Sequence, residues 1–158
     1  MEFSTKSREE LSKLLEKYPD KRSCLLPTLY IAQKEFGWIS PEMMEYVSKE
    51  LDIPVMQVYE TATFYTMFNK KPVGKYHIQV CTNISCSLLD AEHIVKHLEK
   101  KLGISVGDTT DDKLFTLSEV ECLGSCGTAP VMQINDDYYE DLTPEKVDEI
   151  IDKLKNAR

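Results

Sequence analysis

Four of the five cysteines fall into two close pairs, and the positions of these pairs restrict how the chain can fold. Four residues separate Cys81 from Cys86, three separate Cys122 from Cys126, and thirty-five residues lie between the two pairs. Each pair stands where a predicted strand ends and a loop begins. If the two strands are neighbours in one sheet, all four thiols converge at the same edge. Four convergent thiolates are a ligand set for a metal centre.

The second half of the chain has the pattern of an α/β domain. Residues 76–80 alternate between apolar and polar side chains, which predicts a strand that ends at Cys81. The other expected elements are a helix at 87–102 that stops at Gly103, a strand at 114–121, a hairpin from 131–135 and 138–140, and a final helix after Thr143. The expected order is β-α-β-β-β-α, with a mixed sheet of about four strands.

The first seventy residues are expected to form a bundle of four helices. Ser7-x-x-Glu10 has the spacing of a capping box and predicts a helix that reaches about Tyr18. An apolar face predicts the second helix from Leu25, Ser40-Pro41-Glu42 is typical of a helix start, and Pro54 begins the fourth. The helical pattern breaks at residues 69–74. We therefore predict an α+β protein with an N-terminal helical domain at 1–70 and an α/β domain at 71–158.

The charge balance argues against nucleic acid as a partner. The chain has 27 acidic against 19 basic residues, a formal net charge of −8, whereas a protein that binds phosphate backbones needs clustered basic residues. No apolar run is long enough to span a bilayer, so no membrane insertion is expected, and residues 1–10 lack the apolar segment of a signal peptide. We therefore expect a cytoplasmic protein, in which cysteine clusters more often bind metals than form disulfides.

The spacing of the cysteines alone leaves three interpretations open. A structural zinc site and an iron–sulfur cluster are equally favoured, and disulfides or unrelated core thiols are the third possibility. The local sequence favours iron–sulfur, because zinc sites usually have tighter pairs and a two-iron cluster is larger than one ion. Gly124 and Gly127 would also allow backbone N–H groups to approach the sulfur atoms. No nucleotide-binding or hydrolase motif is present in the sequence, so no independent catalytic site is expected.

Several stretches resemble a known family. They are VCTNISC at 80–86, VECLGSCGTAPVMQIND at 120–136, ETATFYTMFNKKPVGKYHIQVC at 60–81 and DLTPEKVDEII at 141–151. Together they are similar to the thioredoxin-like [2Fe–2S] subunit, the E-type subunit, of bacterial NADH dehydrogenase (complex I). The same type of chain occurs as the gamma subunit of NAD-linked hydrogenases and formate dehydrogenases. The resemblance covers nearly the whole chain.

This resemblance implies a thioredoxin-like domain with one [2Fe–2S] cluster, held by Cys81, Cys86, Cys122 and Cys126. It also implies an electron-transfer subunit of an oxidoreductase, placed beside a partner subunit that carries FMN and binds NAD(H), on the cytoplasmic arm of a membrane complex. The alternatives are the equivalent subunit of a soluble hydrogenase or formate dehydrogenase and, in another class, a zinc-stabilised interaction module without a redox role. Ala129-Pro130 lies where thioredoxin folds carry a cis-proline, although most X-Pro bonds are trans.

Two further features of the N-terminal half need an explanation. Cys24 lies outside the four-cysteine motif and is expected to be a small core residue. The apolar and aromatic set at 59–68 either packs in the core or forms a docking surface for another subunit. This set comprises Tyr59, Phe64, Tyr65, Met67 and Phe68.

Overall fold

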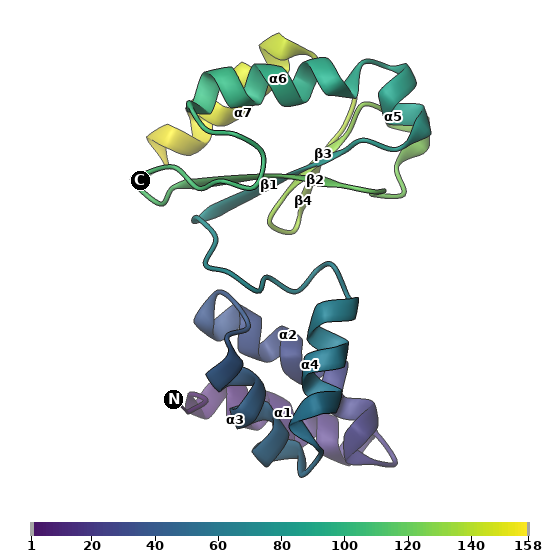
Figure 1. Cartoon of the computed structure of the whole chain (residues 1–158), viewed down its shortest axis with the longest axis vertical. Helices are drawn as coiled ribbons and strands as arrows, with labels where there is room; N and C mark the ends of the chain where they lie inside the picture. Colours follow the sequence, from purple (N-terminus) through teal and green to yellow (C-terminus); the bar gives the residue numbers. More distant parts are fainter. Residues whose placement is uncertain (1, 158) are drawn as a thin grey trace. The chain divides into compact units, whose positions relative to one another are not determined.

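The N-terminal unit is a bundle of helices with its own apolar core. The computed structural model describes residues 2–157, and the chain divides into two compact units between Pro72 and Val73. Within residues 2–72 the α-helices are α1 (Thr5–Lys17), α2 (Leu25–Phe36), α3 (Pro41–Leu51) and α4 (Val55–Phe64), with a short 3-10 helix at Lys21–Cys24 (Figure 1). Their buried side chains include Leu29, Ala32, Met43, Val47, Leu51 and Val58. The four predicted helices are therefore confirmed.

Local capping hydrogen bonds set where these helices begin. The Met43 N–H donates to Ser40 Oγ at 3.1 Å, so α3 starts at the residue that the sequence predicts. For α1 the prediction of Ser7 as the cap is wrong. Ser4 is the cap and accepts the Ser7 N–H at 3.3 Å, so Ser7 lies in the first turn and is buried. The Ser4 N–H is itself held by Glu35 Oε1 of α2 at 2.7 Å, a contact that the local sequence does not reveal.

The apolar set at 59–68 divides between the core and the surface. Phe68 is buried and Tyr65 packs against the core, whereas Tyr59 and Met67 are exposed and Phe64 is 78% exposed. Neither of the two alternatives therefore describes the whole set. Large apolar side chains that remain in water are a typical component of protein–protein contact surfaces.

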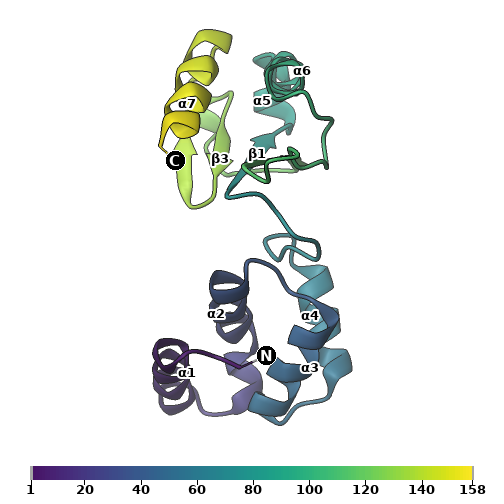
Figure 2. The ribbon, with the colours of Figure 1, turned by 90° about the vertical axis from the view of Figure 1, so that its left-hand side faces the viewer.

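The C-terminal unit is a mixed sheet with helices on one face. Its elements are β1 (Tyr76–Cys81), α5 (Ile84–Leu88), α6 (Ala91–Leu102), β2 (Phe115–Val120), β3 (Met132–Ile134), β4 (Asp137–Tyr139) and α7 (Pro144–Asn156). The strand order is β2-β1-β3-β4, with β1 and β2 parallel and the other neighbours antiparallel. Figures 1 and 2 show α6 and α7 across the same face of this sheet. The predicted mixed four-stranded sheet is confirmed.

The register of the two parallel strands places both cysteine pairs at one edge. Tyr76 pairs with Phe115 at the start of the strands, and Cys81 pairs with Val120 at their end. Ile78 and Leu117 lie between these pairs and point into a core shared with α6 and α7. Because β1 and β2 end side by side, the loops that follow them leave the sheet at the same place.

The helix predicted at 87–102 is wrong in one respect, because two helices occupy this region. The Asn83 side chain accepts the Ile84 N–H at 2.7 Å, and α5 begins there, three residues earlier than expected. Asp90 has a left-handed backbone conformation, with φ of 68°, which separates α5 from α6. As a result Leu88 is 80% exposed and does not join the buried face of α6.

Two further expectations concern the Ala129–Pro130 peptide bond and whether any helix could span a membrane. The Ala129–Pro130 peptide bond is cis. Among residues 2–157, no helix combines the length and the apolar composition needed to cross a membrane.

Candidate metal centre

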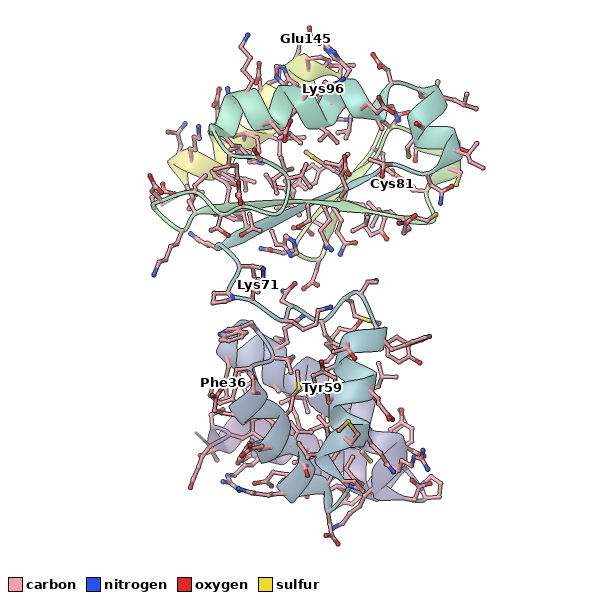
Figure 3. All side chains as sticks on the ribbon, viewed as in Figure 1. Phe36, Tyr59, Lys71, Cys81, Lys96 and Glu145 are labelled. Carbon is pink, nitrogen blue, oxygen red and sulfur yellow. The ribbon has the colours of Figure 1, made fainter. Side chains whose placement is uncertain are left out.

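The first cysteine pair is buried within regular secondary structure. Cys81 is the last residue of β1 and Cys86 lies in α5, and each is only 2% exposed. Figure 3 shows Cys81 at the end of the sheet that adjoins α5. The two thiols pack in a small apolar cluster with Ala91, Ala129 and Val131. Their positions are therefore determined by the packing of the domain.

The second cysteine pair lies in the exposed loop after β2. Cys122 and Cys126 are both exposed, and Cys126 begins a short 3-10 helix at Cys126–Thr128. Gly124 has a φ of +75°, which favours glycine, and its N–H donates to the Cys122 sulfur at 3.3 Å. The expected approach of a backbone N–H to sulfur is therefore confirmed at Gly124 and stays a prediction at Gly127.

Backbone hydrogen bonds attach the end of β1 to both ends of the loop that carries the second cysteine pair. The Cys81 N–H donates to the Val131 carbonyl and the Thr82 N–H donates to the Val120 carbonyl, each at 3.1 Å. Residue 131 follows the second cysteine loop, and residue 120 precedes it. Both ends of that loop are therefore attached to the strand that carries Cys81.

The thiol of Cys81 is surrounded by groups that favour its ionised form. Burial raises the pKa of Cys81, but hydrogen bonds from the backbone N–H groups of Asn83 and Leu123 act in the opposite direction. The side chains of Cys86 and Cys122 also hydrogen bond to this sulfur, and the net pKa of Cys81 is below its ordinary value. A thiolate is the form of cysteine that binds metals.

The pKa of the Cys86 thiol is shifted in the opposite direction, above its ordinary value. Burial raises its pKa, the neighbouring Cys81 raises it further, and the Val131 N–H opposes this change only in part. Cys126 also lies close enough to Cys86 to raise that pKa electrostatically. Cys86 is therefore affected both by Cys81 of its own pair and by Cys126 of the other pair.

The donor set fits a [2Fe–2S] cluster. Within the part of the chain that the structure describes, no group of three or more His, Cys, Asp or Glu side chains is close enough together to hold a metal ion. The Cys81 sulfur is hydrogen bonded to Cys86 of its own pair and to Cys122 of the other pair, and Cys126 acts electrostatically on Cys86. A [2Fe–2S] cluster takes four cysteine thiolates, two on each iron, and backbone hydrogen bonds to sulfur are among the features that tune its potential.

The fifth cysteine belongs to a different environment. Cys24 is completely buried in the core of the helical unit, and its thiol donates to the Leu14 carbonyl at 3.5 Å. Burial raises the pKa of Cys24, which disfavours the thiolate form. The expectation that Cys24 is a core residue is confirmed.

The polar contacts that hold the exposed loop are not predicted by the sequence. The carboxylate of Glu140, which follows β4, accepts hydrogen bonds from the hydroxyl groups of Ser125 and Thr128. Ser125 is 15 positions and Thr128 is 12 positions from Glu140 along the chain. Neither periodicity nor local motifs relate residues at this separation, so only the predicted hairpin of β3 and β4 could have suggested the contact.

The chain is similar to proteins of known type over nearly its whole length. The model of the thioredoxin-like [2Fe–2S] ferredoxin family matches residues 11–155. The E-type subunit of the NADH-quinone oxidoreductase of Rickettsia conorii is 54% identical over 157 residues, which cover 98% of this chain and 94% of that protein. An E-type subunit of the NADH-quinone oxidoreductase of Rhizobium meliloti is 46% identical over 150 residues, covering 95% of this chain and 89% of that protein.

A solved structure supports the fold. A crystal structure of an NAD+-reducing [NiFe]-hydrogenase in the air-oxidized state matches with a TM-score of 0.74 and 22% sequence identity. The match covers 85% of this chain and only 23% of the hydrogenase chain. At this identity the similarity concerns the fold alone.

Proposed function

The chain belongs to the thioredoxin-like [2Fe–2S] ferredoxin family, and from this premise we propose that it is an electron-transfer subunit of an NADH-oxidising dehydrogenase of the NADH-quinone oxidoreductase type. The observation that carries the proposal is the convergence of two cysteine loops at one edge of the sheet, in a chain that is 54% identical to such a subunit. We expect no independent catalytic site in this chain.

Cys81, Cys86, Cys122 and Cys126 are the proposed ligands of one [2Fe–2S] cluster. When bound, such a cluster accepts and releases one electron at a time. Cys81 and Cys86 provide two sulfur atoms from the rigid side of the site, and Cys122 and Cys126 provide two from the exposed side. The Gly124 N–H stabilises negative charge on the Cys122 sulfur. The chain therefore supplies ligation on both sides and hydrogen bonds to sulfur.

The partner is a subunit that carries FMN and binds NAD(H). Electron transfer requires close approach of the two redox centres, so the partner is expected to contact the edge with the exposed cysteines. Ile84, Leu88 and Leu89 present large apolar side chains to solvent near Cys86. Such side chains are typical of the buried centre of a protein–protein interface.

The proposed domains correspond to the two compact units of the chain. We assign residues 1–70 to a helical domain and residues 71–158 to the ferredoxin domain, an assignment supported by the two separate cores. The membership of such subunits in an NADH-quinone oxidoreductase supports a location in the cytoplasm, on the peripheral arm of a membrane complex.

The equivalent subunit of a soluble hydrogenase or formate dehydrogenase is less well supported. The fold similarity to a hydrogenase comes with 22% identity, whereas NADH-quinone oxidoreductase subunits reach 46–54% identity over nearly the full chain. A zinc-stabilised module of another class remains the main alternative to test against.

The test is spectroscopy of the full chain purified or reconstituted without oxygen. We expect two irons and two sulfides per chain, visible absorption, and an EPR signal of a reduced [2Fe–2S] cluster. Cys122→Ser is expected to weaken or alter these features, whereas Cys24→Ser, the matched control in the other unit, leaves the visible spectrum intact. A colourless protein that contains zinc and no iron contradicts the proposal, as does loss of the spectrum in Cys24→Ser. Co-purification with an FMN-containing subunit tests the proposed partner.

A further inference from the structure

A single carboxylate holds the loop that carries the exposed cysteines. Ser125 Oγ and Thr128 Oγ1 lie on either side of Cys126 and Gly127, and both hydroxyl groups donate to the same atom, Glu140 Oε1. The Thr128 contact measures 2.7 Å, and the two hydroxyl oxygens are 3.0 Å apart. The turn that presents the Cys126 thiol is therefore closed by Glu140.

The chain around Glu140 makes three further contacts with this loop or with α7. Tyr138 Oη donates to the Leu123 carbonyl at 3.0 Å, and the Asp141 N–H donates to the Thr128 carbonyl at 2.8 Å. The Glu140 carbonyl accepts from Lys146 Nζ of α7 at 2.6 Å. The segment that follows β4 is therefore fixed to the body of the domain and to both ends of the turn. It provides a rigid support for a loop that has little apolar packing of its own.

The charge of Glu140 has a second consequence for the site. Hydrogen bonds from Ser125 and Thr128 lower the pKa of Glu140, so the side chain is a carboxylate at neutral pH. The two hydroxyl oxygens also lie 3.0 Å from each other, and Thr128 Oγ1 lies 3.3 Å from the Ser125 carbonyl oxygen, so the carboxylate belongs to a hydrogen-bond network within the turn. A negative charge near a redox centre disfavours the addition of an electron, and net charge and hydrogen bonding both set the potential of an iron–sulfur centre. The ammonium group of Lys146 also lowers the pKa of Glu140 electrostatically.

We propose that Glu140 is a positioning residue that holds Cys126 in place for cluster ligation and that its negative charge lowers the reduction potential of the bound cluster. The inference rests on the proposed function, because it assumes that Cys126 is a ligand. It assigns two separable roles to one side chain. The first role depends on the hydrogen bonds, and the second depends on the charge.

Two substitutions separate these roles. Glu140→Gln keeps a carbonyl oxygen with two lone pairs, which can accept both hydroxyl groups, but it removes the charge. We expect this variant to retain its iron as well as the wild type and to show a more positive midpoint potential in an EPR-monitored redox titration. Glu140→Ala removes the hydrogen bonds as well. We expect its iron to be lost to a chelator about tenfold faster, since each bond to a charged acceptor stabilises the folded loop.

A matched control distinguishes the position of Glu140 from charge in general. Glu121 is adjacent to Cys122 but exposed, so its charge is screened by water. We expect Glu121→Gln to shift the potential by much less than Glu140→Gln. Equal shifts in the two variants, or an unchanged potential in Glu140→Gln, overturn the electrostatic role. Iron retention in Glu140→Ala equal to that of the wild type overturns the positioning role.

A further measurement does not require the cluster. In the metal-free chain, hydrogen exchange of the backbone amides at residues 125–128 is expected to be faster in Glu140→Ala and close to wild type in Glu140→Gln. If the wild-type chain binds no [2Fe–2S] cluster, the proposed function fails, and the role of Glu140 in the potential fails with it. If the wild type binds the cluster and the Glu140 variants behave like it in every measurement, only the inference on Glu140 fails.

Discussion

The two cysteine pairs are placed at the same edge of the sheet by different physical means. Cys81 and Cys86 belong to β1 and α5 and are buried, so their positions follow from the packing of the apolar core. Cys122 and Cys126 belong to an exposed loop, whose shape depends on a glycine in a left-handed conformation and on hydrogen bonds from the segment after β4. One side of the site is therefore rigid before any metal binds, and the other depends on polar contacts at the surface.

The largest effect is expected when one cysteine of each pair is replaced by serine. Cys86→Ser and Cys126→Ser are both expected to lose most of the bound iron. Cys86→Ser also places a hydroxyl group in an apolar pocket and is expected to destabilise the metal-free chain by about 1–3 kcal/mol. Cys126 is exposed, so Cys126→Ser is expected to change the stability of the metal-free chain by less than about 0.5 kcal/mol. Urea unfolding of the two metal-free variants measures the difference, and equal losses of stability would show that the two loops do not differ in this way.

The next effect concerns the backbone of the exposed loop. Gly124 has φ of +75° and no atom within 4 Å of the position where a Cβ would stand. Gly124→Ala is therefore strained only by its backbone conformation, at a cost of about 1–2 kcal/mol. The expected result is iron release several-fold faster than in the wild type, measured with a chelator.

Gly127→Ala is the matched control for this change. Gly127 lies in the same loop with equal space for a methyl group but without a left-handed φ. We expect its iron release to be close to that of the wild type. Similar behaviour of the two alanine variants would contradict the explanation based on backbone strain.

A smaller and pH-dependent effect concerns the rigid side of the site. Burial lowers the pKa of His77 on β1, whose Nε2 lies 2.9 Å from Ser118 Oγ on β2. In the unfolded chain His77 takes up a proton near its ordinary pKa, whereas in the folded chain it stays neutral to lower pH. The free energy of unfolding is therefore expected to fall as the pH decreases below about 6.5, until the folded form is also protonated.

His77→Gln removes this titration while keeping a polar side chain beside Ser118. Urea midpoints measured from about pH 7.5 to about pH 5 should therefore fall less steeply in this variant than in the wild type. Identical slopes in the two proteins would show that other groups cause the loss of stability in acid.

The smallest effect on folding is expected at the exposed face of α5. Leu88 is 80% exposed while Cys86 on the same short helix is buried. Leu88→Gln is expected to change the stability of the isolated chain by less than about 0.5 kcal/mol and to reduce the yield of co-purified FMN-containing subunit. Lys100→Gln on the exposed face of α6 is the control and should leave the yield unchanged. Equal yields for Leu88→Gln and wild type would remove this helix from the proposed interface.

Local patterns in the chain were sufficient for the order of the elements. Alternation of apolar side chains predicted β1, and the expected strand at 114–121 contains β2. Ser40 and Thr143 predicted the starts of α3 and α7, because a cap and the N–H group that it binds are only three residues apart. The prediction failed at Ser4 and at Asp90. The first depends on a contact with Glu35 in another helix, and the second is a left-handed residue inside an otherwise helical pattern.

Apart from the start of α1 and the break at Asp90, the sequence by itself determined the order of the strands and helices and placed both cysteine pairs after the ends of β1 and β2, since these features depend on neighbours within a few positions. Only the tertiary structure decided that Cys86 is buried while Cys122 is exposed, and that Glu140 closes the turn around Cys126. These differences depend on contacts between segments that are distant along the chain. Such contacts form only when the pairing of the strands has brought their loops to the same edge of the sheet.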